Sequence, residues 1–460
     1  MLWWLVAIVA GVMLTRLMPP FQSPDEDTHL GRAAMLANGQ LLLSQSEHGV
    51  RDSGEVDENF AAFAEAAARQ KPRTPALDPA ARARLAQKAD ELHWRDKDIS
   101  VLAAGTGYYT PVLYVPHALA LGIAKGLNLS MTQTYELTRA IVIISALSIA
   151  LYACMIWRPN LLMLMLLLTP MSVAQWFSPT LDGLANALLL LLLALWLRAF
   201  RAQEGVSKSA VWCRGEALIY LIVFILCTTR THLLPTLLIP ATLLIRRLSW
   251  QRLMALVLLT LCVLGWQAFA ASVSGHHNLH RNHSTKEIIF IYLASPLEFF
   301  SVLANTLGDN FYLNQYRRGF AGILGWLDVP LGNNKVQTIY SSLLAGLALT
   351  LWGGLRWQRR DLLIRLSVAV MVVASILIAF FALAVSWNDY PATAINGIQG
   401  RYFIPVALIL AFGLGSLDLH RKYGRLELIL LFLFAAYSLH ETAKLLLKYY
   451  YLNPFDAWLK

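Results

Sequence analysis

Apolar runs long enough to cross a lipid bilayer recur along this chain of 460 residues. Leu181 to Leu197 and Leu253 to Ala271 are two of them. About twenty predominantly apolar residues are needed to cross roughly 30 Å of hydrocarbon as a helix. Because 57% of the residues are hydrophobic and only 14% are charged, the composition excludes a disordered chain and an ordinary soluble enzyme. The sequence predicts an all-α polytopic membrane protein.

The formal net charge of +10 does not indicate nucleic-acid binding in a chain of this kind. Basic residues on the cytoplasmic loops of a membrane protein account for such an excess, so we expect no nucleic acid among the partners. The four cysteines lie in or beside apolar segments and lack the spacing of a metal site. They predict neither a disulfide framework nor a zinc centre.

Counting the apolar segments predicts about eleven transmembrane helices and two extracytoplasmic loops. We expect a first span at 1–18, an outer loop with juxtamembrane helices at 19–130, spans two to seven within 131–273, a second outer loop at 274–335, spans eight to eleven within 336–446, and an outer tail at 447–460.

One segment, Thr110 to Leu129, decides the orientation, because its prolines and polar residues allow it either to span or to lie along the interface. If it lies along the interface, every short basic loop falls on one side, which the positive-inside rule makes cytoplasmic. These loops carry Arg158; Arg198, Arg201, Lys208 and Arg214; Arg246, Arg247 and Arg252; Arg356, Arg359 and Arg360; Arg421, Lys422 and Arg425. We therefore expect a re-entrant or interfacial segment.

The first outer loop opens with three consecutive carboxylates, Asp25, Glu26 and Asp27, followed by His29. One interpretation is a solvated helix start, since Pro24 and acidic residues suit a helix N-terminus. The other is a general base held at the bilayer surface. Asp25 and Asp27 are also candidate oxygen ligands for a divalent cation.

Three further ionisable residues interrupt apolar sequence on the outer side: Asp182, Arg230 and Arg401. Ionisable side chains at such depth usually face a partner or a wet cavity, although an arginine at the rim also snorkels to the interface. An arginine in this position suits a charge-assisted contact to a lipid phosphate.

Five ordered blocks resemble an uncharacterised family of bacterial predicted membrane proteins. They are Pro20-x-Gln22-x-Pro24-Asp25-Glu26-x-x-His29-x-x-Arg32-Ala33, Tyr108-Tyr109-x-Pro111-x-x-Tyr114-x-Pro116, Ser178-Pro179-x-x-Asp182-x-x-x-Asn186, Leu324-Gly325-Trp326-Leu327-Asp328 and Gln399-Gly400-Arg401-Tyr402-Phe403. That family looks like part of the GT-C class of membrane glycosyltransferases. The resemblance implies a GT-C-like fold in the bacterial cytoplasmic (inner) membrane, with a catalytic carboxylate near the first span and an active site on the periplasmic side.

The function that the resemblance implies is inverting transfer of a sugar from an undecaprenyl-phosphate donor to a cell-envelope glycan such as O-antigen, or to a lipid-linked oligosaccharide. Asp25 is the expected base, with Glu26 as second choice or organiser. Arg401 and Arg230 are expected to bind the donor phosphate, His29 and Asp182 to shape the pocket, and Tyr402 and Trp326 to stack on a sugar. A divalent cation fits the acidic cluster but is not required. A transporter or flippase of a lipid-linked glycan, or a structural subunit of a glycan-assembly complex, are the alternatives.

Overall fold

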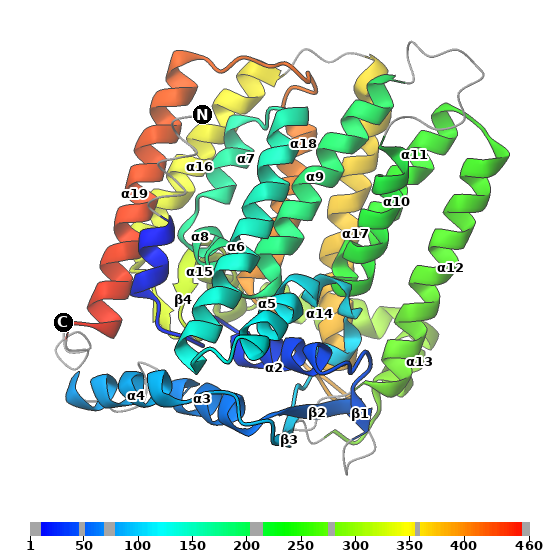
Figure 1. Ribbon diagram of the computed structural model, residues 1–460. Coiled ribbons are helices and arrows are strands. Elements are labelled where there is room, and N and C mark those ends of the chain that lie inside the picture. The colour runs from blue at the N-terminus through cyan, green and yellow to red at the C-terminus, as the bar shows by residue number, and fades with distance from the viewer. Residues whose placement is uncertain are drawn as a thin grey trace.

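The computed structural model describes residues 11–45, 51–68, 79–202, 215–274, 281–354 and 359–452. The chain is mostly helical, at 75%, with few strands. Upright helices form one broad bundle, and a layer of shorter elements lies across one of its ends (Figure 1). Most of the predicted first span, and the end of the predicted tail, lie outside the described residues; Gly11 to Leu17 are helical.

Within the described ranges, five helices are long and apolar enough to cross a membrane. They are α6 (Met131–Ile156), α9 (Leu181–Ala202), α12 (Trp250–Val273), α17 (Leu362–Ser386) and α19 (Arg425–Tyr450). A sixth would be counted only if α13 (Thr285–Ala294) and α14 (Pro296–Gly308), which meet at a bend of 102°, formed one span. The expected total of about eleven stays a prediction.

Most of the other segments expected to span are shorter or broken: α7 (Leu161–Leu167) with α8 (Pro170–Trp176), α10 (Glu216–Thr229), η3 (Thr231–Leu237) with α11 (Leu238–Arg246), and η5 (Gly400–Phe403) with α18 (Ile404–Leu414). Another, α16 (Asn333–Gly354), is as long as α9 at 22 residues but is not among the five. The first break has a local cause, because proline lacks an N–H and Thr169 caps the new helix by accepting from the Ser172 N–H.

The segment that decided the orientation does not cross the bundle. It forms η2 (Pro111–Tyr114) and α5 (Val115–Gly126), which packs on α2 (Glu26–Ala37) and α6. Twelve helical residues reach about 18 Å, well short of the roughly 30 Å of a hydrocarbon core. In Figure 1, α5 lies beside the layer at the lower end of the bundle.

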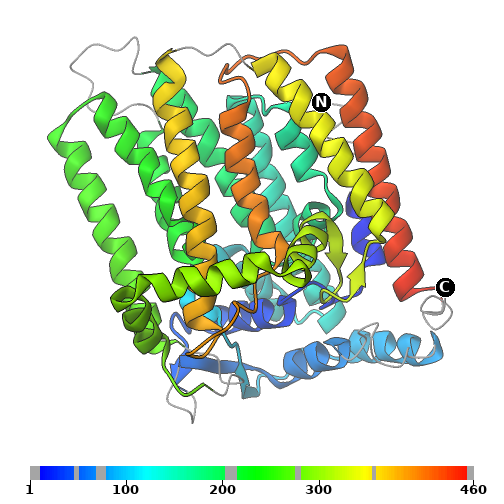
Figure 2. The same ribbon diagram turned by 180° about the vertical axis from the view of Figure 1, so that it is seen from behind.

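The layer itself contains a small antiparallel sheet that the sequence did not predict. Its order is β1-β2-β3, from β1 (Ser44–Gln45), β2 (Arg51–Asp57) and β3 (Asp98–Leu102), and it is flanked by α3 (Glu58–Ala68) and α4 (Pro79–Glu91). The strands are short and β2 is polar, and the alternation in β3, where Ile99 and Val101 follow polar residues, is too short to mark a strand. Residues 285–330 add α13, α14, α15 (Asn310–Gly322) and the β4–β5 pair (Ile323–Leu324, Val329–Pro330). Figure 2 shows α14 running across the upright helices.

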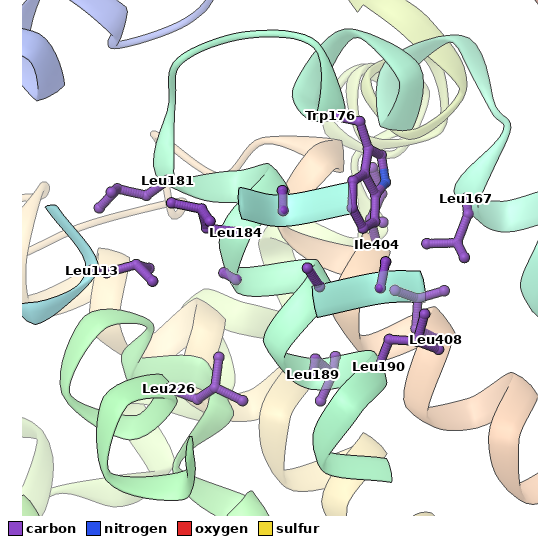
Figure 3. Packing of buried hydrophobic residues seen from close by; sticks show 14 of the residues in the cluster. Leu113, Leu167, Trp176, Leu181, Leu184, Leu189, Leu190, Leu226, Ile404 and Leu408 are labelled. Atoms are coloured by element: carbon purple, nitrogen blue, oxygen red, sulfur yellow. The ribbon is translucent and has the colours of Figure 1, made fainter. Parts of the chain in front are cut away.

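Helix α9 is the buried centre of the bundle, with 89% of its most apolar stretch enclosed by protein. Figure 3 shows Leu184, Leu189 and Leu190 of α9 among side chains from η2, α7, α8, α10 and α18. A helix packed on all sides has little freedom to shift. Its first turn, which carries Asp182, is therefore held rigidly at the end of the bundle nearest the layer.

The opposite end of the bundle holds the basic connections and separate ion pairs. Arg252 donates to both carboxylate oxygens of Glu216 at 2.7 and 2.9 Å, with both side chains fully buried. Arg201 pairs with Asp361, and Arg421 pairs with Glu427. These pairs join the start of α10 to α12, the end of α9 to the residue before α17, and the residues before α19 to its first turn.

Candidate functional site

Asp25 begins helix α2 in an unusual backbone conformation. Its φ of 60° and ψ of 15° lie in the left-handed region, which among residues with side chains Asp and Asn tolerate best. Its side chain is 47% exposed, although protein surrounds it closely. Backbone strain of this kind persists where the surroundings enforce it and is concentrated at functional sites.

Glu26 enforces the turn that presents Asp25. Its carboxylate accepts from the Phe21 N–H at 3.1 Å, the Ser23 N–H at 2.8 Å and the Tyr135 hydroxyl at 2.5 Å. The side chain is fully buried, and this burial raises the pKa of the carboxyl. Glu26 faces the turn and not open space, so its geometry suits the organiser role and not that of a base.

Arg401 connects Asp25 with Asp182. Its Nη2 donates to Asp25 Oδ2, its Nη1 to Asp182 Oδ2 at 2.9 Å, and its Nε to Gln399 Oε1 at 2.5 Å. Only 4% of the side chain is exposed. Arg401 thus joins two segments that lie 376 residues apart in the sequence. Burial raises the pKa of Asp25, but the positive charge of Arg401 outweighs this effect, so the pKa lies below its usual 3.8.

Arg230 completes the network from the far side of Asp182. Its Nη2 donates to Asp182 Oδ1, while Gln175 Nε2 donates to Oδ2 at 3.0 Å. The guanidinium also lies over the ring of Tyr109, 5.6 Å from its centroid. Two arginines and two aspartates therefore form one chain of contacts, Arg230–Asp182–Arg401–Asp25, whose formal charges cancel.

His29 lies next to this network and is buried. Its Nδ1 is 2.8 Å from the Tyr114 hydroxyl. Burial, reinforced by the nearby positive charge of Arg230, lowers the pKa of His29 to about 4. The imidazole is accordingly neutral at neutral pH and adds no charge to the site.

A small cavity, with about 10 Å³ of space and room for roughly one water molecule, is lined by residues of the turn of 21–25 (the aspartate turn) and of the arginine–aspartate network. Ser23 and Pro24, which precede Asp25, line it on one side, and Asp182 and Arg401 line it on another. The cavity thus marks the place where the aspartate turn and Arg401 come together.

The remaining candidates have other partners. Trp326 donates its indole N–H to the Phe21 carbonyl at 2.8 Å, which fixes the β4–β5 turn against the aspartate turn. The ring of Tyr402 lies 5.4 Å from the Arg401 guanidinium. Asp27 accepts from the Thr28 N–H at 2.8 Å. Among the residues with described positions, no group of three or more His, Cys, Asp or Glu side chains suits a metal ion.

Two residues that hydrogen-bond the site carboxylates were not identified from the sequence. Gln175 holds Asp182, and its signal was a lone amide seven residues earlier in an otherwise apolar run. Tyr135 holds Glu26 from within α6, and no local pattern distinguishes it from a membrane-interface tyrosine.

Gly400 allows the close approach that positions Arg401. A Cβ at this position would lie 2.1 Å from the Tyr316 carbonyl oxygen and 2.3 Å from the Phe320 nitrogen, both backbone atoms of α15. We predict that Gly400→Ala lowers the free energy of unfolding by more than the roughly 1–3 kcal/mol typical of overpacking, because backbone cannot give way. Thermal unfolding in detergent measures this. Gly265→Ala is the matched control, since its Cβ would meet nothing within 4 Å; equal effects would contradict the prediction.

Comparison with known proteins adds a family but no characterised relative. No curated protein and no solved structure matches the chain. Residues 8–410 match the family model described as "Predicted membrane protein (DUF2142)". That match includes the aspartate turn, Asp182, Arg230 and Arg401, and it covers most of the chain. The protein belongs to this family of membrane proteins.

Proposed function

We propose that the protein is an inverting GT-C-type glycosyltransferase that moves a sugar from a polyprenyl-phosphate donor, such as undecaprenyl phosphate, to a hydroxyl of a cell-envelope glycan. The observation that carries the proposal is the contact between Asp25 and Arg401 at the edge of the cavity. It brings together a carboxylate able to accept a proton and a cation able to bind a phosphate. This pair is what direct displacement of a lipid phosphate requires.

Asp25 is ionised at neutral pH, as a general base must be, but its contact to Arg401 lowers its pKa and makes it a weak proton acceptor until that contact is lost. As the acceptor oxygen forms its bond to the anomeric carbon, the bond from that carbon to the phosphate oxygen breaks. The acceptor proton passes to Asp25, and the electron pair leaves with the lipid phosphate. Attack from the side opposite the leaving group inverts the anomeric centre.

Arg401 is the proposed binding group for the phosphate, with Arg230 behind it. In the described structure carboxylates neutralise both arginines. A donor phosphate would replace Asp25 on Arg401, which leaves the carboxylate free to accept a proton. The planar guanidinium suits this exchange, since it binds carboxylate and phosphate with the same geometry.

The proposed setting is the bacterial cytoplasmic membrane, with the layer and the cavity on the periplasmic side. The expected partners are the lipid-linked sugar donor, a glycan or lipid-linked oligosaccharide acceptor, and membrane lipids. The described ends of α9, α11 and α18, which carry or adjoin basic residues, lie at the end of the bundle opposite the layer (Figure 1), as the positive-inside rule requires of this orientation.

We predict that Asp25→Asn lowers the transfer rate about 10²- to 10⁴-fold, the usual contribution of a positioned base. Asparagine also tolerates the left-handed backbone and can accept from Arg401, so the fold should persist. The measurement is release of undecaprenyl phosphate by protein in nanodiscs supplied with undecaprenyl-phosphoryl sugars and a panel of lipid-linked oligosaccharides. Asp90→Asn, on the exposed side of α4, is the control. Equal rates in the two variants would show that Asp25 is not the general base. If the wild-type protein releases no undecaprenyl phosphate, a flippase or a structural subunit is favoured instead.

The exchange on Arg401 predicts a specific dependence on pH. In the free protein Arg401 helps to hold the pKa of Asp25 below 3.8, whereas loss of that contact to an anionic phosphate raises it. A base loses activity as the pH falls through its pKa. The acid limb of kcat/KM, which reports the free protein, should therefore lie below pH 3.8, and the acid limb of kcat should lie at higher pH. A kcat limb at the same or lower pH would contradict the exchange.

The orientation is tested by cysteine labelling in a background without the four native cysteines. Ser100→Cys, on the exposed face of β3, should react with an impermeant thiol reagent added outside intact cells. Lys422→Cys, at the opposite end of the bundle, should react only after permeabilisation. The reverse pattern would place the cavity in the cytoplasm and overturn the proposed donor.

A further inference from the structure

His29 and Tyr114 form a buried pair beside the arginine–aspartate network. Tyr114 is fully buried, and within the described ranges the only hydrogen-bond partner of its hydroxyl is His29 Nδ1, at 2.8 Å. A buried hydroxyl hydrogen without an acceptor is costly, and this nitrogen is the one acceptor that the hydroxyl has. Tyr114 therefore donates the hydrogen bond, and Nδ1 accepts it.

This contact determines which nitrogen of His29 carries a hydrogen. A neutral imidazole has one N–H, and its other nitrogen is an acceptor. Since Nδ1 accepts from Tyr114, the hydrogen lies on Nε2. In the part of the chain that the structure describes, Nε2 has no hydrogen-bond partner, although only 5% of the residue is exposed. An enclosed donor without an acceptor indicates a place for an oxygen atom of a ligand.

The position of His29 brings this donor close to the network. Its backbone N–H donates to the Asp25 carbonyl at 2.9 Å, and helical side chains lean toward the N-terminus, which here is the side of Asp25. The imidazole centroid lies 6.1 Å from that of the Tyr109 ring, which in turn lies 5.6 Å from the Arg230 guanidinium. All four charged residues of the network influence the pKa of His29. A group bound to Arg401 in place of Asp25 would therefore lie next to this imidazole.

We propose that His29 Nε2 donates a hydrogen bond to a phosphate oxygen of the lipid-linked donor, and that Tyr114 is the positioning residue that keeps the hydrogen on this nitrogen. The inference rests on the proposed function and deepens it by naming a second phosphate-binding group beside Arg401. The exchange of Asp25 for phosphate would supply the oxygen acceptor that Nε2 lacks. His29 does not line the small cavity, so the contact does not depend on the volume of that cavity.

This hydrogen bond would strengthen during the transfer. The donor phosphate is a diester with one negative charge. When its bond to the anomeric carbon breaks, the electron pair stays on the lipid phosphate as a second charge. A hydrogen bond to an ionised oxygen strengthens as negative charge develops there, so His29 would stabilise the leaving group more than the bound donor. Its loss should therefore lower kcat more than it raises KM.

Binding of farnesyl phosphate to the purified full-length protein in nanodiscs tests the contact. We expect His29→Leu to weaken binding at least about tenfold, because it removes a hydrogen bond to a charged oxygen. His29→Gln should recover most of the affinity, since its amide again offers an N–H. His440→Leu, at an exposed histidine of α19, is the matched control and should bind as the wild type does. Equal affinity of the wild type and His29→Leu would overturn the inference.

Two further ligands identify the oxygen that His29 binds. Farnesol lacks the phosphate, so its binding should be the same in the wild type and in His29→Leu. Parallel loss of farnesol and farnesyl phosphate binding would show a structural defect and reject the phosphate contact. Weaker binding of farnesyl-phosphoryl glucose alone, with farnesyl phosphate unaffected, would place the oxygen on the sugar and likewise reject the phosphate contact.

The position of the hydrogen is tested in the wild-type protein, where no substitution can disturb folding. Nitrogen-15 NMR of protein labelled at histidine distinguishes protonated from unprotonated ring nitrogens, and the signals of His29 are those missing from His29→Gln. We expect a protonated Nε2 whose signal shifts when farnesyl phosphate is added. Tyr114→Phe should give a mixture of the two neutral forms, an effect that a merely structural role of Tyr114 would not produce. A hydrogen on Nδ1 alone in the wild type would overturn the inference.

Failure of this inference is distinguishable from failure of the proposed function. If farnesyl phosphate binds independently of His29 but release of lipid phosphate still depends on Asp25, the His29 contact alone is wrong. If the wild type neither binds farnesyl phosphate nor releases lipid phosphate, the proposed function is wrong and the His29 contact is rejected with it.

Discussion

The site depends on the ion pairs of one buried carboxylate, that of Asp182. Two arginines from different parts of the chain, Arg230 and Arg401, converge on its two oxygens, and Arg401 continues to Asp25. A charge removed from water is costly unless it is paired and hydrogen-bonded. Loss of Asp182 would leave Arg230 without the carboxylate that it binds and Arg401 with one of its two. The network is therefore stable as a unit and couples α9, the end of α10, η5 and the aspartate turn.

Backbone packing determines where these charges lie. A Cβ at Gly183 would meet the Gln175 carbonyl oxygen at 2.8 Å, so α9 begins directly against α8 and carries Asp182 next to Gln175. Gly400 brings η5 equally close to α15 and positions the following Arg401. On the other side, Glu26 and Trp326 hold the turn of Phe21 to Asp25. Backbone packing and hydrogen bonds outside the ion pairs thus help to position the ionic groups.

The sequence predicted the helical membrane class, because long apolar runs have few alternatives. It also expected residues 110–129 not to span, and the structure has only the short helices η2 and α5 in that segment. It also selected Asp25, Asp182, Arg230 and Arg401, since ionisable residues in apolar sequence must find partners. It could not predict which pairs form, because Arg401 and Asp25 are 376 residues apart and their contact depends on the whole bundle. For the same reason the sequence could not decide which of the neighbours Asp25 and Glu26 is the candidate base. The two side chains differ in the direction in which the turn points them, and the sequence does not show that direction. The sheet was missed because its strands are short and its central strand, β2, is polar.

A network of balanced charges can bind an anion only by exchange. Free arginines at this depth would attract phosphate strongly but would be costly in the empty protein, whereas Asp25 and Asp182 remove that cost. Of the two carboxylates, Asp182 is almost enclosed and Asp25 is 47% exposed. Asp25 is thus the partner that an incoming phosphate displaces with the least disruption. The same displacement weakens the contact that makes Asp25 a poor proton acceptor, so under the proposed mechanism donor binding would activate the base.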